Sequence, residues 1–283
     1  MNGQFNAFIQ TVLKIAKPTP HLIKYVLFKT IEGKKLSFES KLSFSGNLVN
    51  LNVGDFVQYW MYMDGVYERP WVKLIRERIQ GQPFLDIGAN VGNFCLSICD
   101  VASQVFAIEA SSHCCNSIEQ AIRKNKIKNI EVANLAVFNR SGESIDLFLS
   151  PDTHGNNSIF SAGKRETTER VATITIDDFC KNRNITSLGL IKMDIEGAEA
   201  MALKGAQNTL QSLKPDLVIE FNQPTSKLHG QDVAELWSTL SGLGYRAYHL
   251  KSGRLGPFAL PDDYATLNKN ILFVHGSKPS PVN

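Results

Sequence analysis

From residue 84 onward, short runs of apolar residues alternate with segments in which apolar residues recur every three or four positions. Short apolar runs are typical of buried strands, and apolar residues at intervals of three or four are typical of amphipathic helices. Strands are expected at residues 84–87, 105–108, 130–135, 190–193, 217–221, 245–250 and 271–274. Helices are expected at residues 93–102, 112–126, 198–213 and 232–243. This order predicts an α/β fold with a seven-stranded, mostly parallel sheet and helices on both of its faces.

The first 70 residues follow a different pattern and predict a small helical and β extension. Apolar residues recur at helical spacing from Phe5 to Ala16, before Pro18 ends the run, and residues 36–60 switch to short strand-like runs. We expect residues 71–283 to form the main domain. The first helix is expected to pack on its own domain, and contact with a membrane surface or a partner is the alternative.

Composition narrows the class of protein without naming its function. Hydrophobic residues make up 43% of the 283 residues and charged residues 20%, which is typical of a globular domain with a sizeable core. The net charge of +3 is too small for the basic surface of a nucleic-acid binder. No apolar run approaches the ~20 residues of a membrane-spanning helix. The five cysteines have no zinc-site spacing, and their odd number favours a reducing compartment, so a cytoplasmic protein is expected.

A glycine turn directly after the first strand of the main domain is the most specific candidate for ligand binding. Gly88 and Gly92 let the chain turn sharply and bring its backbone against a ligand. The dinucleotide fingerprint G-x-G-x-x-G is absent because Asn90 replaces the middle glycine. Asp86 adds a negative charge where a pyrophosphate would lie, so the site suits a cationic ligand and disfavours a dehydrogenase.

Glu109 ends the second strand of the main domain, 21 residues after Gly88. An acidic residue about 20 residues beyond such a turn accepts hydrogen bonds from ribose hydroxyls. Together with Asp86, it describes a site for a nucleoside that carries positive charge and no phosphate. S-adenosylmethionine has this chemistry and is the predicted cofactor.

A third acidic segment follows the fourth strand, at residues 191–199. Ligands of parallel sheets bind beyond the carboxyl ends of the strands, so we expect Asp194 and Glu196 to face the same crevice as Asp86 and Glu109. Closely spaced carboxylates raise one another's pKa, which is one way to prepare a general base. Glu199 either joins this group or places a favourable charge at the start of the next helix.

Several ordered motifs resemble the FkbM family of S-adenosylmethionine-dependent methyltransferases. They are G-x-Y-E at residues 65–68, D-[IV]-G-A-N-x-G at 86–92, T-[LI]-D-D at 175–178 and K-x-D-[IV]-E-G-x-E at 192–199. The resemblance runs from about residue 65 to the last strand. It implies a Rossmann-like class I methyltransferase fold and methylation of a hydroxyl oxygen, often on a sugar, a glycan or a natural product. The first 60 residues fall outside it and are expected to lie on the acceptor side.

Under this hypothesis each candidate residue has a role. The methionine end of the cofactor would lie against Asp86 and the backbone of residues 88–92, the ribose on Glu109, and the adenine under Asn134 or its neighbours. Asp194 and Glu196 are the candidates for orienting the acceptor or removing its proton, and Asp194 is also a candidate for cofactor binding. His154 is a third candidate because it lies in a polar loop, residues 150–158, that would close over a site.

Three alternatives remain open at this stage. No metal is predicted, but Asp194, Glu220 and Asn222 offer the oxygen ligands that magnesium prefers. A nucleic-acid methyltransferase shares the fold, although the residues after Asp194 lack the Asn/Asp-Pro-Pro-aromatic run expected of an enzyme that methylates exocyclic amines. A cofactor-binding module without catalytic activity is the third. The acceptor is expected to be a small molecule or glycan, with no nucleic acid as partner and the oligomeric state undetermined.

Overall fold

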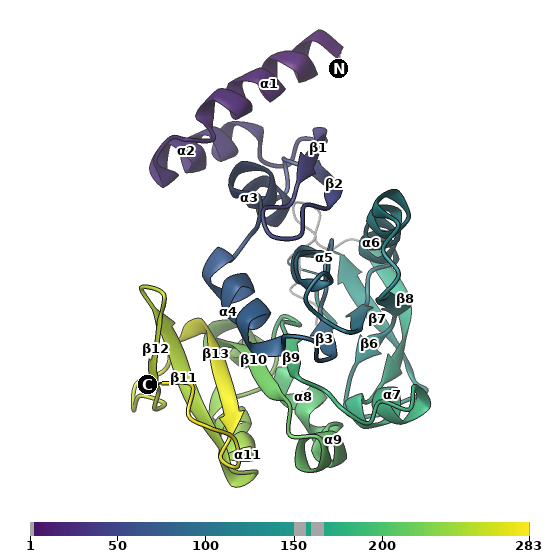
Figure 1. Ribbon diagram of the computed structural model, residues 1–283, viewed down its shortest axis with the longest axis vertical. Helices are drawn as coiled ribbons and strands as arrows, with labels where there is room; N and C mark the ends of the chain where they lie inside the picture. The colour runs from purple at the N-terminus through teal and green to yellow at the C-terminus, as the bar shows by residue number, and fades with distance from the viewer. Residues whose placement is uncertain (1–2, 150–156, 160–166, 283) are drawn as a thin grey trace.

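A computed structural model describes residues 3–149, 157–159 and 167–282, and its centre is an eight-stranded sheet (Figure 1). The strand order is β12-β11-β13-β10-β9-β3-β4-β5. The central strands β5, β4, β3, β9 and β10 run parallel, and β13 pairs antiparallel with both β10 and β11. The strands are β3 (Phe84–Ile87), β4 (Val105–Glu109), β5 (Ile130–Asn134), β9 (Leu190–Met193), β10 (Asp216–Asn222), β11 (Tyr245–Lys251), β12 (Arg254–Pro257) and β13 (Asn268–His275).

All seven predicted strands are present, and the predicted number of strands is one too low. The additional strand, β12, pairs antiparallel with β11 at the edge of the sheet. Its four residues, Arg254 to Pro257, are exposed or half-buried and include a glycine and a proline. Because an exposed edge strand needs no apolar face, the hydrophobic pattern carried no signal for it.

Alternate residues of the central strands pack into two apolar cores on opposite faces of the sheet. Phe84 and Val105 belong to one core, whereas Leu85 and Phe106 belong to the other. Side chains of a strand point alternately to the two faces, so continuous apolar strands are what a sheet covered on both sides requires. The first core contains residues of α4 (Arg69–Ile79), α5 (Asn93–Ile98) and α6 (Ser112–Asn125). The second contains residues of α7 (Ile176–Asn182), α8 (Glu199–Lys204), α9 (Gln207–Ser212) and α11 (Val233–Gly242).

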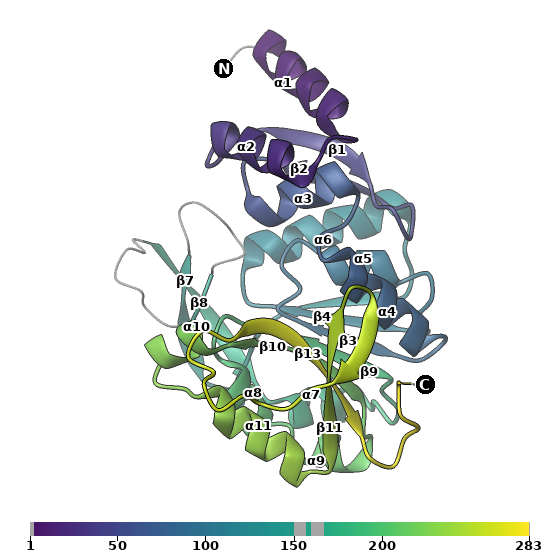
Figure 2. The same ribbon diagram turned by 90° about the vertical axis from the view of Figure 1, so that its left-hand side faces the viewer.

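The N-terminal extension lies at one end of the molecule in both views (Figures 1 and 2). It consists of α1 (Gly3–Ala16), α2 (His21–Ile31), β1 (Ser37–Lys41), β2 (Leu48–Asn52) and α3 (Phe56–Asp64). Helices α1 and α2 are called the N-terminal helix pair below. Buried residues of the extension share one core with α4, α5 and α6. The apolar packing is continuous across residue 70, and the division into residues 1–70 and 71–283 stays a prediction.

The strands predicted within residues 36–60 are confirmed for β1 and β2. The prediction is wrong for residues 56–60, which belong to α3. Helix α3 begins at Phe56, because the Asp55 side chain accepts a hydrogen bond from the Gln58 amide at 3.1 Å and caps the helix. Gly65, with φ 74°, ends it. These two caps were the available signals for a helix in a segment whose apolar residues do not alternate.

The predicted insertion at residues 138–186 contributes two strands to a small three-stranded sheet. Its order is β6-β8-β7, formed by β6 (Ala136–Val137), β7 (Ser144–Leu149) and β8 (Thr167–Ile174). A short helix, α10 (Gln223–Leu228), follows β10. Across the described residues no helix is long and apolar enough to cross a bilayer. All five cysteines are buried with free thiols, as expected of core residues.

Candidate functional site

A cavity of about 640 Å³ opens at the carboxyl ends of β3, β4, β9 and β10. Strand order reverses here, because the chain passes from β3 outward through β4 to β5 and returns to place β9 on the other side of β3. Ligands of open α/β sheets bind at such reversal points. The volume lies within the range of small-molecule and cofactor sites, roughly 300–1,000 Å³.

The glycine turn brings two loops of the cavity into direct contact. Gly88 has φ 77°, and a Cβ atom added there would lie 1.9 Å from the backbone oxygen of Asp194. Only glycine permits this approach, so the loop after β3 and the loop after β9 form one wall. Asn90, with φ 50°, also adopts the left-handed conformation and lines the cavity. The backbone of this turn is therefore accessible to a ligand in the cavity.

Asp86 lies beneath the turn, buried and in contact with the start of α5. Its carboxylate accepts a hydrogen bond from the Cys95 amide at 2.9 Å. Burial raises the pKa of Asp86 to about 7, although Lys192 and this hydrogen bond act in the opposite direction. Asp86 therefore supports the helix N-terminus as well as lining the cavity. The sequence suggested only the second role.

Glu109 connects the glycine turn to the start of α6. Its two carboxylate oxygens accept hydrogen bonds from the Asn90 and Ser111 amides, each at 2.8 Å. Burial raises the pKa of Glu109, and the two amides oppose that shift. Since each carboxylate oxygen has a second lone pair, Glu109 still has acceptor capacity towards the cavity that it lines.

Two predicted cofactor residues lie outside the cavity lining. Gly92, with φ 93°, faces Leu96, and a Cβ atom there would approach the Leu96 side chain to 2.7 Å. Its role is the turn itself. The Asn134 side chain points back to the backbone oxygens of Glu109 and Ala110, at 3.1 and 2.7 Å. Its neighbour Leu135 lines the cavity instead, in keeping with the wider prediction for this strand end.

Lys192 is a buried cation on the wall of the cavity. It comes from β9, whose four residues are all buried, and its Nζ lies 3.1 Å from the Asp194 carboxylate. Burial would lower the pKa of Lys192, but the carboxylates of Asp194, Glu68 and Glu220 outweigh burial and raise it. Lys192 therefore stays charged and partly neutralises an acidic site.

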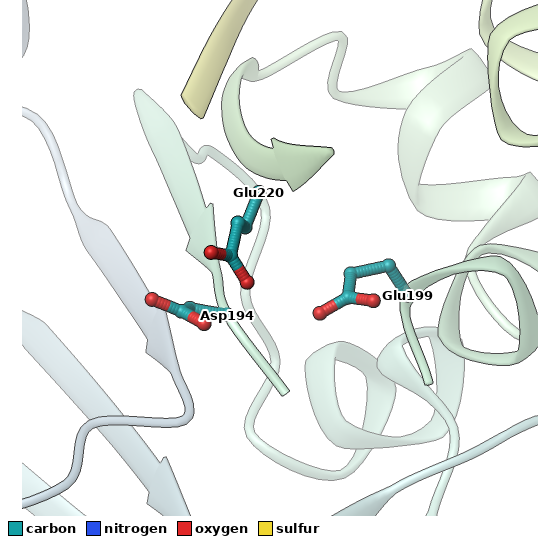
Figure 3. Close-up of side chains that lie close together, drawn as sticks. All are labelled: Asp194, Glu199 and Glu220. Carbon is teal, nitrogen blue, oxygen red and sulfur yellow. The ribbon is translucent and has the colours of Figure 1, made fainter. Parts of the chain in front are cut away.

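Asp194, Glu199 and Glu220 bring one carboxylate oxygen each within 4.8 Å of one another (Figure 3). Burial, followed by the charges of Asp194 and Glu196, raises the pKa of Glu220 to about 9. Burial also raises the pKa of Glu199 to about 7, while its Oε1 accepts a hydrogen bond from the Ile195 amide. At neutral pH Glu220 therefore holds a proton, whereas the Asp194 side chain is 37% exposed and pairs with Lys192. That the site holds no metal stays a prediction. Under this prediction, activity should survive a chelator.

Glu68 lines the same cavity from the position directly before α4. It has φ 51°, and its Oε1 accepts a hydrogen bond from Asn270 at 2.8 Å. The other oxygen, Oε2, is buried with no hydrogen-bond partner in the described residues. Burial raises the pKa of Glu68 to about 7. The preceding residue, Tyr67, exchanges two hydrogen bonds with the Asn93 side chain, at 2.9 and 3.0 Å, which ties this segment to α5.

The structure brings most of the predicted site residues to one cavity. Those that line it are Asp86, Gly88, Asn90, Glu109, Asp194 and Glu196, together with Glu220 and Asn222 of the metal alternative. His154 lies outside the described residues. Sequence reasoning gave no role to Lys192 or Glu68. A lysine inside a four-residue apolar strand was the available signal for Lys192, because a buried lysine requires carboxylate partners.

Comparison with known proteins decides what kind of site this is. The sequence profile of the Methyltransferase FkbM domain matches residues 86–247, which is more than half of the chain. The chain belongs to the FkbM methyltransferase family. Its match begins at Asp86 and includes both the glycine turn and the acidic segment around Asp194. Membership confirms a methyltransferase with a Rossmann-like fold and S-adenosylmethionine as the cofactor.

Individual FkbM and other methyltransferase proteins are only distantly similar. Hexuronic acid methyltransferase AglP of Haloferax volcanii is 24% identical over 173 residues, which cover 60% of this chain and 69% of AglP. The crystal structure of a Methyltransferase FkbM from Methylobacillus flagellatus is 18% identical with a TM-score of 0.45, over 69% of this chain and 44% of that one. TYW2 of M. jannaschii in complex with AdoMet is 13% identical with a TM-score of 0.41, over 86% and 88%.

Proposed function

We propose that the protein transfers a methyl group from S-adenosylmethionine to a hydroxyl oxygen of a sugar, with a hexuronic acid or a glycan containing one as the acceptor. Membership of the FkbM family and the similarity to AglP support the reaction and the acceptor class. The observation that carries the hydroxyl assignment is Asp194, an accessible carboxylate on the cavity wall that pairs with the buried Lys192. The nucleic-acid alternative has no comparable support.

The residues present fit the cofactor. When bound, S-adenosylmethionine supplies an electrophilic methyl group on a sulfonium cation. The backbone of Gly88 and Asn90 would hold its amino-acid end, with the Asp86 carboxyl group beneath it. Glu109 would accept hydrogen bonds from the ribose hydroxyls, and the apolar Leu135 would lie against the adenine. An excess of buried carboxylates suits a cationic ligand that carries no phosphate.

Asp194 removes the hydroxyl proton. A sugar hydroxyl is a weak nucleophile, so its oxygen must lose a proton as the new bond forms. Lys192, whose Nζ lies 3.1 Å away, donates a hydrogen bond to the Asp194 carboxylate and limits its rotation. Glu220 is unsuited to this role at neutral pH because it already holds its proton. Glu196, on the same loop, orients the acceptor.

The acceptor reaches the cavity from the N-terminal extension, as expected from the sequence. Glu32 after α2, Phe56 and Val57 of α3, and Tyr67 all line it. These residues offer aromatic and apolar faces beside a carboxylate, a combination that suits a sugar ring with its hydroxyl groups. All four residues precede the FkbM match, which begins at Asp86. An acceptor site built from them could therefore differ between members of the family.

The experiment supplies ¹³C-methyl S-adenosylmethionine and a glucuronic acid-containing oligosaccharide and locates the new methyl group by NMR. We expect an alkali-stable methyl ether. A methyl ester, which mild alkali releases as methanol, would contradict the proposal because a carboxylate needs no base to be methylated.

Substitution of the proposed base sharpens this experiment. Asp194→Asn should lower the rate of ether formation about 10²- to 10⁴-fold and leave S-adenosylmethionine affinity close to that of the wild type. Asp262→Asn, at an exposed position away from the cavity, is the matched control and should change neither quantity. Equal rates for the two variants would remove Asp194 as the base.

A further inference from the structure

The N-terminal helix pair exposes most of the large apolar side chains that face solvent in the described chain. Eight large apolar residues are exposed in the described part of the chain, and seven of them lie between residues 5 and 26. The seven are Phe5, Phe8, Ile15, Leu22, Ile23, Tyr25 and Val26. Apolar residues gathered on one patch of a surface mark an interaction site, whereas single ones are ordinary.

Helix α1 carries a broad apolar face, and the rest of the extension covers only part of it. Phe5, Phe8, Val12 and Ile15 recur at intervals of three and four, so they lie along one side of the helix. Leu13 and Ala16, on the adjoining side, are buried in the core of the extension. Ile15 is 71% exposed. The first helix therefore packs on its own domain, as expected, with only part of its apolar surface.

Helix α2 carries apolar residues on both of its sides, and Phe28 and Ile31 on the inner side are buried. Its buried side includes Lys24, whose Nζ forms an ion pair with Asp64 at 2.5 Å. Its opposite side exposes Leu22, Ile23 and Val26, and Leu22 is 72% exposed. Because a surface helix normally buries its apolar face, the exposed apolar side of α2 fits a contact outside the chain.

Positive charge surrounds this apolar patch. Residues 1–35 contain six lysines and one glutamate, a net charge of +5, whereas the remaining residues contain 24 basic and 26 acidic side chains. Lys29 Nζ lies 5.6 Å from the Tyr25 ring centre, and Lys34 Nζ lies 6.0 Å from the Phe5 ring centre. The lysines are thus placed directly beside the exposed rings.

We propose that the N-terminal helix pair docks on an anionic lipid membrane, with its apolar side chains inserted among the acyl chains and its lysines on the headgroups. Exposed apolar residues flanked by lysines complement a surface that is apolar below and negatively charged above. A second copy of the chain would meet this patch with the same positive charge. The helices lie in the plane of the interface and do not cross it, in agreement with their length.

Vesicle flotation of the full-length chain tests the proposal. We expect the protein to float with vesicles of phosphatidylcholine that contain phosphatidylglycerol, and to bind phosphatidylcholine alone about tenfold more weakly. Leu22→Gln with Val26→Gln should lower the partition coefficient at least tenfold. Lys29→Gln with Lys34→Gln and Lys35→Gln should lower it at least tenfold and weaken its dependence on salt.

Controls separate docking from misfolding and from self-association. The matched charge control, Lys73→Gln with Lys128→Gln and Lys251→Gln, alters exposed lysines elsewhere and should float as the wild type does. Every variant should bind S-adenosylmethionine with wild-type affinity, which shows that it is folded. The proposal is overturned by a wild-type protein that does not float, by equal flotation of the helix-pair and control variants, or by a dimer that Leu22→Gln with Val26→Gln dissociates without any effect of vesicles.

Discussion

The carboxyl edge of the large sheet and the N-terminal helix pair depart from the usual distribution of side chains in opposite directions. At the sheet edge, charged residues such as Asp86, Glu109 and Lys192 are buried. In the helix pair, large apolar residues such as Ile15 and Leu22 are exposed. Burying charge costs free energy, and exposing apolar surface leaves stabilisation unused. Neither arrangement is explained by folding, which suggests that each serves a ligand.

The two regions differ in how strongly their side chains depend on one another. Lys192 interacts with the carboxylates of Asp194, Glu68 and Glu220 together. Within the described part of the chain, the exposed apolar residues of the helix pair have no comparable network of buried charges on their outer side. Substitution of Lys192 should therefore affect folding as well as the site, whereas substitutions on the exposed side of the helix pair should affect only contacts outside the chain.

Removal of the buried cation has the largest expected effect. Lys192→Met leaves several buried carboxylates without their positive partner, and the free energy of unfolding should fall by about 3–5 kcal/mol. Urea denaturation followed by circular dichroism measures this. Lys73→Met, at a lysine whose side chain is 67% exposed, is the control and should unfold as the wild type does. Equal unfolding midpoints for both variants would break the comparison between the regions.

Substitution of the ribose acceptor should have the next largest effect. Glu109→Gln removes a charged acceptor and should weaken S-adenosylmethionine binding by about 1.5–3 kcal/mol, or roughly 10- to 150-fold in Kd. Calorimetric titration gives the value. Glu119→Gln, on the exposed side of α6, is the matched control. An unchanged Kd for Glu109→Gln would remove the ribose assignment.

The pH dependence of stability sharpens the account of the buried carboxylates. The pKa of Glu220 is raised from 4.5 to about 9, so between these values the folded chain holds a proton that the unfolded chain has released. Stability should therefore be highest on the acid side of this window and fall as the pH rises through it. Glu220→Gln should flatten the fall by at most about 1.4 kcal/mol per pH unit. Identical pH profiles for variant and wild type would argue against a buried, protonated Glu220.

The smallest expected effect belongs to the helix pair. Leu22→Gln with Val26→Gln changes side chains that face solvent, so the free energy of unfolding should stay within about 0.5 kcal/mol of the wild type. The measurement is the same urea denaturation. A loss as large as that of Lys192→Met would show that the exposed side of α2 supports the fold after all.

The sequence predicted the parts of the molecule that repeat a simple pattern. The buried strands from Phe84 to Val274 were identified because each is an apolar run of ordinary length, and Gly88 was identified because a sharp turn after a strand requires glycine. The edge strand at Arg254 and the helix at Phe56 were missed, since one has no apolar face and the other is defined by its caps.

The candidate site was predictable as a set of acidic residues but not as a network. Asp86, Glu109 and Asp194 follow strand ends, and parallel strands end at one edge of a sheet. The contribution of Glu68 depends on a fold in which residues 68 and 270 meet, and no local pattern reports that contact. The hydrogen bonds that direct Asn134 away from the cavity are likewise tertiary.

Calorimetric titration of the full-length protein with S-adenosylmethionine and, separately, with a nicotinamide dinucleotide tests the central claim most directly. The claim is that the buried carboxylates at the sheet edge form a site for a cationic nucleoside without phosphate. It predicts micromolar binding of S-adenosylmethionine and no detectable heat with the dinucleotide. Binding of the dinucleotide, or of neither compound, would contradict it.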